Sequence, residues 1–303
     1  MPWVLWGHSG GGNWAGDMLL LHPERVIAAW LRSGAPRLSS NALARANLTL
    51  SPSALAVPVM CNPGIKEREG RFSGAWKSAV TFFHDFRAQG GLVGLAVDPR
   101  SEHDCGASRY LAIPWIDACL SARLPKRIGA PLRPMPTNSA WLASWPGNSA
   151  QPAAHFSNDP TQAVWLPNER IAKAWAEYVQ EAKVSDSTPP PPPFNLEARS
   201  LHGAIELSWD AEADLESGLA GFVIERDGEE IARVPAGLGG KSANAPFQRV
   251  SFHDTPESPI PAMSFTDTGV QPGAKHHYRV IALNTAGLKS KPSKLVKAAA
   301  LPR

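Results

Sequence analysis

The segment Val4–Gly12 places a serine where it could act as a nucleophile. It begins with an apolar run typical of a buried strand, continues as Gly7-His8-Ser9-Gly10-Gly11, and leads into a helical pattern. Gly-x-Ser-x-Gly between a strand and a helix is the nucleophile elbow, a sharp turn that lifts a serine hydroxyl above a sheet. The helix N-terminus beneath the turn favours developing negative charge. We therefore predict Ser9 as a nucleophile and the Gly10 N–H as an oxyanion donor.

After the elbow, the chain alternates between short apolar runs and a helical pattern. The runs at 25–31, 57–61 and 92–97 suit buried strands, and residues 72–89 carry apolar side chains at helical spacing. Such alternation predicts right-handed crossovers and a parallel sheet. From the elbow onward the chain resembles the second half of an α/β-hydrolase, so the expected fold class of residues 1–184 is α/β.

The resemblance implies where the partners of Ser9 lie, because this family orders its residues as Ser, then Asp or Glu, then His. Glu67 follows the second of the apolar runs, where the family usually places its acid, and Glu69 and Asp98 are the alternatives. His103 falls on the loop after the third run. It would take the serine proton and return it to the leaving group. Glu67 would orient the imidazole and stabilise the imidazolium.

The resemblance covers only part of that fold. The family builds several central strands before the elbow, and one of their loops supplies a second oxyanion donor. Only eight residues precede Ser9. We therefore expect a fragment of a longer carboxylic-ester hydrolase, lacking those strands and that donor, with its own turnover an open question. The alternative is a non-catalytic hydrolase remnant that serves in binding or adhesion.

Composition excludes several other classes of function. A chain of 303 residues is typical of two domains, and 43% hydrophobic against 19% charged residues is ordinary for a globular protein. The 30 basic and 27 acidic residues form no basic stripe, so nucleic-acid binding is not expected. No apolar run reaches the length of a membrane helix. The expected acyl-enzyme chemistry on an ester substrate needs no metal and no organic cofactor.

Three cysteines leave the redox setting open. Cys61 follows a predicted strand at the acid loop, Cys105 lies on the histidine loop, and Cys119 belongs to an apolar helix. Because the two loops should converge, a Cys61–Cys105 disulfide is conceivable, and buried reduced thiols are at least as well supported. Their spacing indicates no metal site.

A change of composition marks a domain boundary. Residues 125–168 are rich in Pro, Asn, Ser and Trp without clear periodicity, which favours tryptophans filling irregular packing over an aromatic wall of the site. A helix then begins near Asn168. Five consecutive prolines at 189–193 predict a stiff linker over 185–193, between domains at 1–184 and 194–303.

The segment after the linker has the pattern of an all-β domain. Residues 204–209 alternate with period two, and 221–234 predicts two strands joined by an Asp-Gly hairpin turn. Turns at this spacing predict a β-sandwich. Leu207-Ser208-Trp209, Tyr278-Arg279-Val280 and Asn284-Thr285-Ala286-Gly287 resemble a fibronectin type III domain. The resemblance implies that Trp209 fills the core and that the Tyr278 hydroxyl bonds to backbone at the sandwich corner.

The fibronectin type III resemblance also implies a cellular location. This family commonly acts as a spacer or adhesion module beside extracellular hydrolases, so we expect an extracellular or cell-envelope location. It further implies a carbohydrate or protein contact through this domain. His276 and His277 are interpreted as strand-end residues.

Overall fold

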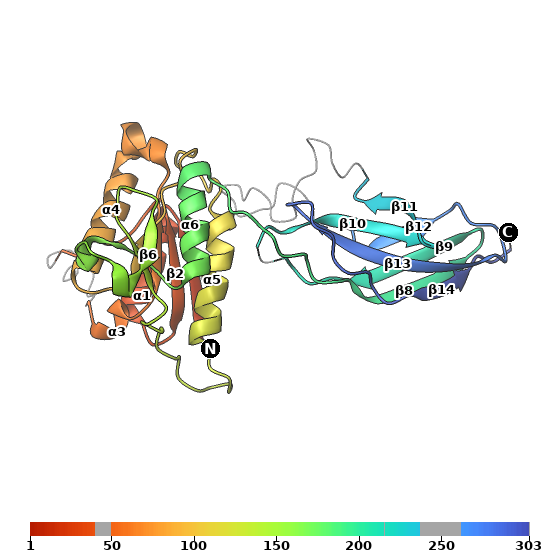
Figure 1. The fold of residues 1–303 in the computed structure, drawn as a ribbon, viewed down its shortest axis with the longest axis horizontal. Coiled ribbons are helices and arrows are strands. Elements are labelled where there is room, and N and C mark those ends of the chain that lie inside the picture. Colours follow the sequence, from red (N-terminus) through yellow and green to blue (C-terminus); the bar gives the residue numbers. More distant parts are fainter. Residues whose placement is uncertain (40–49, 215, 237–261, 303) are drawn as a thin grey trace. The chain divides into compact units, whose positions relative to one another are not determined.

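The computed structural model describes residues 1–39, 50–214, 216–236 and 262–302. The chain divides into two compact units, Met1–Val184 and Ser185–Arg303 (Figure 1). The first combines helices with a parallel sheet, and the second contains antiparallel sheets. The predicted fold class is confirmed for both units.

A four-stranded parallel sheet forms the centre of the first unit, in the order β1-β2-β3-β4. Its strands are β1 Trp3–His8, β2 Val26–Arg32, β3 Val59–Asn62 and β4 Val93–Leu95. Every residue of β2 is buried, as expected of a strand with both faces covered. β1 lies at one edge of this sheet, and its Trp6 side chain is 46% exposed. Parallel pairing brings the carboxyl ends of all four strands to one side.

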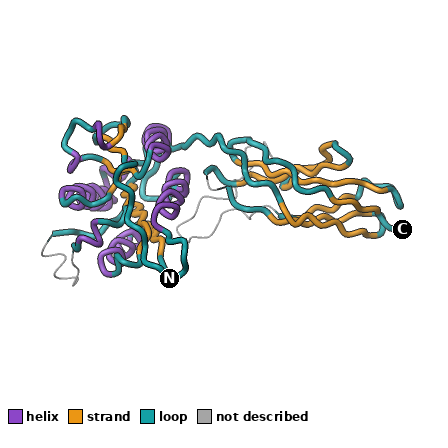
Figure 2. Tube along the Cα trace, turned by 60° about the horizontal axis from the view of Figure 1, so that its bottom comes forward, coloured by secondary structure: helices purple, strands orange, loops and turns teal. Residues whose placement is uncertain are grey.

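Helices lie on both faces of this sheet (Figure 2). α4 covers one face and α5 and α6 cover the other (Figure 1). Asn168 begins α6, because its side chain accepts a hydrogen bond from the Ile171 N–H at 3.0 Å. The predicted helix over 72–89 corresponds to α4, and the helix expected around Cys119 corresponds to α5. The described helices are α1 Gly10–Leu21, α3 Pro52–Leu55, α4 Ser73–Ala88, α5 Arg109–Arg123 and α6 Glu169–Glu181.

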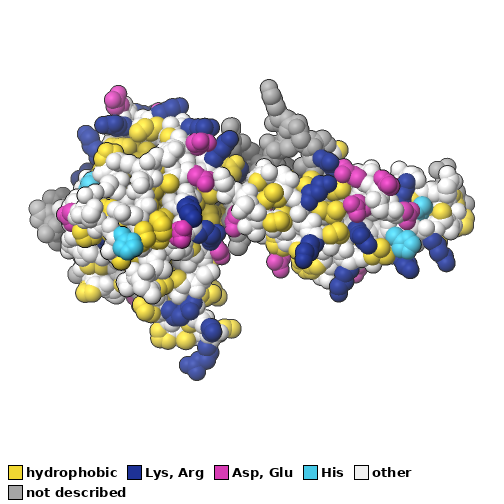
Figure 3. Space-filling model, viewed as in Figure 1, with side chains coloured by type: hydrophobic (Ala, Val, Ile, Leu, Met, Phe, Trp, Pro, Cys, Tyr) yellow, Lys and Arg dark blue, Asp and Glu magenta, His cyan; other side chains and the backbone are white. Residues whose placement is uncertain are grey.

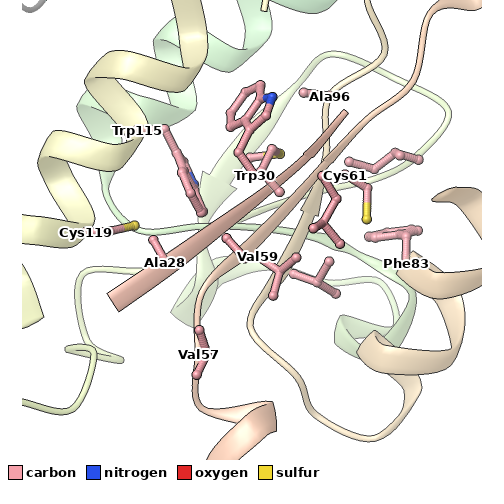
Figure 4. Packing of buried hydrophobic residues seen from close by; sticks show 14 of the residues in the cluster. Ala28, Trp30, Val57, Val59, Cys61, Phe83, Ala96, Trp115 and Cys119 are labelled. Carbon is pink, nitrogen blue, oxygen red and sulfur yellow. The ribbon is translucent and has the colours of Figure 1, made fainter. Parts of the chain in front are cut away.

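The core of the first unit lies between the sheet and these helices (Figure 4). Trp30 of β2 and Trp115 of α5 are fully buried, with ring centroids 5.8 Å apart. Towards α4, Phe83 lies near Cys61 of β3. Burying several large side chains at about 1.5–3 kcal/mol each anchors the strands firmly, so the loops at their carboxyl ends start from fixed positions.

The segment 125–168, in which we predict no regular elements, contains a small antiparallel sheet in the order β6-β5-β7. Its strands are β5 Trp141–Ala143, β6 Ala150–Pro152 and β7 Val164–Leu166. Strands of three residues are too short to show a period-two pattern, so this sheet was missed. Trp165 is buried here, and the Trp145 ring packs against Phe83 and His84. Tryptophan packing is therefore the interpretation that the structure supports.

The second unit is a β-sandwich of two antiparallel sheets, ordered β11-β10-β13-β14 and β12-β9-β8. Trp209 is buried in its core and packs edge-on against Phe222, as predicted. The hairpin turn lies at Asp227-Gly228, where both residues have positive φ, as a type I′ turn requires. The strands are β8 Phe194–Leu201, β9 Ala204–Asp210, β10 Leu219–Arg226, β11 Glu229–Val234, β12 Ser264–Asp267, β13 Lys275–Asn284 and β14 Val296–Ala299.

The predicted partner of Tyr278 is wrong. Its buried hydroxyl donates to the carboxylate of Asp267 at 2.8 Å and not to backbone. Asp267 also accepts from Arg226 at 2.9 Å, so the carboxylate joins two strands of one sheet to β12 of the other. Burial, followed by this hydrogen bond, raises the pKa of Tyr278 well above its ordinary value. A charged acceptor on a strand outcompetes a backbone carbonyl here.

The surface has mixed charge. On the face seen in Figure 3, Lys and Arg side chains are interspersed with Asp and Glu. None of the helices in the described segments is long and apolar enough to cross a membrane.

Candidate active site

Ser9 occupies a strained turn between β1 and α1. Its backbone angles are φ 55° and ψ −119°, a conformation that costs a non-glycine residue about 1–3 kcal/mol. Close packing maintains the turn: a Cβ on Gly7 would lie 2.0 Å from the Gly11 carbonyl oxygen, and one on Gly34 would lie 2.2 Å from that of Ser9. The Ser9 N–H donates to the Arg32 carbonyl at 2.8 Å. The local sequence therefore forms the predicted elbow.

Loops at the carboxyl ends of the strands bring His103 and Glu67 to Ser9. His103 Nε2 lies 2.8 Å from Ser9 Oγ, and His103 Nδ1 lies 2.8 Å from Glu67 Oε1. Glu67 belongs to the short 3₁₀ helix Ile65–Arg68 after β3, and His103 to the loop after β4. The Glu67 side chain is fully buried and that of His103 is 8% exposed. The structure thus joins the three predicted residues in one hydrogen-bonded chain.

The two alternative acids lie elsewhere. Glu69 is exposed. Asp98 is buried and accepts from the backbone N–H groups of Arg100 and Ala107, both at 2.9 Å, and from the Tyr178 hydroxyl at 3.3 Å. Burial alone would raise the pKa of Asp98, but these backbone hydrogen bonds and the nearby Arg32 charge lower it. Asp98 is therefore an ionised carboxylate that shapes the histidine loop.

The acid loop and the histidine loop are also joined directly by backbone. The Ile65 N–H donates to the Asp98 carbonyl at 2.9 Å, and the Lys66 N–H donates to that of Ser101 at 3.2 Å. Gly64 permits this approach, since a Cβ there would lie 2.4 Å from the Glu102 carbonyl oxygen. The relative position of Glu67 and His103 is therefore set by a short backbone ladder and not by the two side chains alone.

Arg32 holds the histidine loop against the sheet, a role that sequence reasoning missed. It lies at the end of β2 and is fully buried. Its guanidinium donates to the Asp104 carbonyl at 2.7 Å, the Ser101 hydroxyl at 2.6 Å and the Asn62 carbonyl at 2.9 Å. The available sequence signal was a charged residue at the end of an apolar strand run. Such an arginine is expected to be buried with the strand, and a buried guanidinium needs several hydrogen-bond acceptors around it.

Two rings flank the imidazole of His103. The Phe72 ring stacks on it with centroids 4.1 Å apart and an interplanar angle of 7°. The His8 ring lies 4.9 Å away at 45°. His8 is thus a neighbour of His103, and it is the ring of His103 that faces Ser9 Oγ. Phe72 was missed, since we treated it only as the beginning of a helical pattern.

A pocket with a volume of about 560 Å³ opens at Ser9 and His103. Its other lining residues include Asn13, Asp17, Arg37 and Arg71, and Phe72 forms part of its wall. Gly10 is the first residue of α1, where N–H groups have no intrahelical partner, and a Cβ placed on it would meet open space. Its N–H is thus available at the predicted oxyanion position.

The cysteines and metal-binding residues add no further centre. None of Cys61, Cys105 and Cys119 forms a disulfide, so the conceivable Cys61–Cys105 bridge is not made in this structure. Burial raises the pKa of the Cys61 and Cys119 thiols far above the ordinary value. Within the described segments, no group of three or more His, Cys, Asp or Glu side chains is placed to hold a metal ion.

Comparison with known proteins identifies similarity in fold alone. No family model and no curated protein matches the chain. Solved structures similar to part of it include a Fn3-like protein from Clostridium thermocellum, with 19% identity over 36% of this chain and 92% of that one and a TM-score of 0.24. The fibronectin type III domain of human fibronectin type III domain containing protein 3 has 21% identity, covering 39% of this chain and 93% of that one, with a TM-score of 0.26. A Yersinia enterocolitica family 28 exopolygalacturonase has 20% identity, covering 37% of this chain and 21% of that one, with a TM-score of 0.27.

Proposed function

We propose that the α/β unit acts as an α/β-hydrolase-type serine esterase, cleaving carboxylic esters through an acyl-enzyme. The observation that carries the proposal is the chain of two 2.8 Å contacts from Glu67 through His103 to Ser9, at a strained elbow that opens into a pocket. Nucleophile, base and orienting acid in hydrogen-bond reach of one another are the signature of nucleophilic catalysis.

The geometry suits a defined sequence of proton transfers. An ionised carboxylate only accepts hydrogen bonds, so Nδ1–H of His103 donates to Glu67 and Nε2 is left to accept from the Ser9 hydroxyl. As Ser9 Oγ bonds to the ester carbonyl carbon, its proton passes to Nε2. That proton then goes to the departing alkoxide, which leaves as an alcohol when the C–O bond breaks.

Water completes the cycle by the same route. His103 takes a proton from water as the hydroxide oxygen bonds to the acyl carbon, and returns it to Ser9 Oγ as the acyl–serine bond breaks. The carboxylic acid product leaves. Through both halves, the Gly10 N–H and the N-terminus of α1 would stabilise the oxyanion. Phe72, stacked on the ring, would keep the imidazole in its plane during both transfers.

Covalent labelling tests the nucleophile apart from turnover. We expect a fluorophosphonate probe to label Ser9 in the full chain, and 4-nitrophenyl acetate to be hydrolysed by the same residue. Both signals should disappear in Ser9→Ala, and neither should change in Ser39→Ala, an exposed serine outside the pocket. Labelling without turnover would support Ser9 as the nucleophile. It would place the defect in oxyanion stabilisation, where removal of one donor lowers turnover by about 10²–10³-fold. If a folded chain is neither labelled nor active, the esterase proposal falls in favour of a binding role.

A further inference from the structure

The lining of the pocket in front of Ser9 contains more positively than negatively charged side chains. Arg37 follows β2 and Arg71 lies in the 3₁₀ helix Gly70–Phe72, and both line the pocket with exposed side chains. Within the described residues, neither guanidinium forms an ion pair with a carboxylate. The two side chains come from separate elements of the unit.

One carboxylate lines the same pocket as the two arginines. Asp17 of α1 also lines the pocket, and its partial burial raises its pKa above the ordinary value. The remaining titratable group of the lining is His103, which is engaged by Ser9 and Glu67. Two guanidinium groups against one carboxylate leave the pocket with a net positive charge when the imidazole is neutral.

The positive charge lies close to the reacting atoms. The Arg71 guanidinium lies 5.4 Å from the centroid of the Phe72 ring, and that ring stacks on His103 at 4.1 Å. A substrate whose carbonyl carbon contacts Ser9 Oγ must place the rest of its acyl or alcohol part in this pocket. Such a part would therefore come within a Debye length, about 8–10 Å, of Arg71.

We infer that this pocket selects esters that carry a carboxylate group in addition to the ester, an inference that rests on the proposed esterase function. The planar guanidinium fork matches a carboxylate in two parallel hydrogen bonds. Arg37 and Arg71 would bind this second group, while Asp17 would oppose it. Because all three side chains are at least partly exposed, each is expected to change selectivity by about two- to fivefold and not by orders of magnitude.

A matched pair of substrates isolates the charge. Mono-4-nitrophenyl adipate carries a free carboxylate, and its methyl ester has nearly the same shape without the charge. In the full chain, we expect kcat/KM for the acid to exceed that for the methyl ester. The ratio should fall about two- to fivefold in Arg37→Gln and in Arg71→Gln, and should rise in Asp17→Asn. It should also fall as ionic strength increases, because salt screens exposed charges.

A folding defect would lower the rates for both substrates in every variant. The Asp17→Asn variant distinguishes this case, because it is expected to raise the ratio that the arginine variants lower. Arg127→Gln, a change to an exposed arginine outside the pocket lining, is the matched control and should leave the ratio unchanged. If Ser9-dependent hydrolysis is present but the ratio stays near one in every variant, the charge inference is wrong and the esterase proposal stands.

A binding measurement covers the case in which neither ester is turned over. Titration of monomethyl adipate into the full-length Ser9→Ala variant, followed by calorimetry, should show saturable binding that weakens when Arg71→Gln is added. Dimethyl adipate should bind less tightly than the acid. Equal binding of the two compounds, or binding of neither, would overturn the inference whatever the outcome of the rate measurements.

Discussion

Each unit of this protein contains a histidine hydrogen-bonded to a carboxylate, and the two pairs differ in what surrounds them. His103 Nδ1 lies 2.8 Å from Glu67, and His276 Nδ1 lies 2.6 Å from Asp227. The first pair is buried, whereas the Asp227 side chain is 45% exposed. His103 Nε2 faces Ser9 Oγ, whereas His276 Nε2 has no hydrogen-bond partner in the described segments. A short histidine–carboxylate contact alone therefore does not distinguish the proposed catalytic pair from a structural pair; the group that faces the other ring nitrogen does.

The pair in the sandwich closes a turn. Asp227 lies in the hairpin between β10 and β11 with φ 54°, and it also accepts from the His277 N–H at 2.8 Å. The hydrogen bond from His276, followed by that from the His277 backbone, lowers the pKa of Asp227 to about 2. His276 and His277 thus bind the hairpin to the beginning of β13 and are strand-end residues, as predicted.

The largest expected effect separates the two histidines. His103→Ala removes the group that takes the Ser9 proton, and loss of a residue from such a unit lowers kcat by about 10⁴-fold or more. His276→Ala should leave kcat for 4-nitrophenyl acetate within about twofold. Steady-state kinetics on both variants measure the contrast. Equal losses in the two variants would mean that the site is not the one described.

The next contrast compares the carboxylates. Glu67→Gln keeps the shape but can no longer stabilise the imidazolium, and we expect kcat to fall by about 10²–10⁴-fold. Asp227→Asn makes the same change of charge in the sandwich and should leave kcat unchanged. Glu69→Gln tests the rejected alternative on the same loop. Activity that depends on Glu69 and not on Glu67 would contradict the assignment.

Arg32 and Arg226, one in each unit, give a smaller contrast, seen mainly in stability. Arg32→Met leaves the acceptors of the histidine loop without donors, and breaking such a network costs about 3–5 kcal/mol. We expect a lower unfolding temperature of the α/β unit together with reduced kcat. Arg226→Met, which removes a partner of Asp267, should lower the unfolding temperature of the sandwich and spare kcat. Calorimetry of the full chain follows both transitions, and a loss of kcat in Arg226→Met would break the comparison.

The smallest effect is a pH dependence confined to the sandwich. Because the pKa of Asp227 in the folded chain lies near 2 and its ordinary value is 3.8, Asp227 adds stability that is present above about pH 4. This stability is lost as the pH falls through about 2. The unfolding temperature of the sandwich in wild type should therefore approach that of Asp227→Asn over this interval. Parallel curves for the two proteins from pH 5 to about pH 2 would rule out the shift.

Local and non-local features differed in how far they could be predicted. The elbow, α4, α5 and the Asp-Gly hairpin were predicted from patterns within a few residues, and the resemblance to a fibronectin type III domain placed Trp209 in the sandwich core. The three-stranded sheet within 125–168 was not, because its strands are shorter than the window in which a period shows. Tyr278 was expected at the sandwich corner with a backbone partner, but its partner Asp267 belongs to another strand whose position no local pattern reveals.

What the sequence by itself determined is the elbow that carries Ser9. Ser9 stands on a turn at which a Cβ on Gly7 would collide with the backbone of Gly11, so the signal and its cause lie in the same few residues. Only the tertiary structure decided which acid faces His103. Glu67, Glu69 and Asp98 stand on two adjacent loops. Their order along the chain ranked them as candidate acids only through the resemblance to the α/β-hydrolase family. Backbone hydrogen bonds between these loops turn Glu67 inward, leave Glu69 exposed and engage Asp98 in the histidine loop, because contacts between distant segments form only when the sheet aligns their ends.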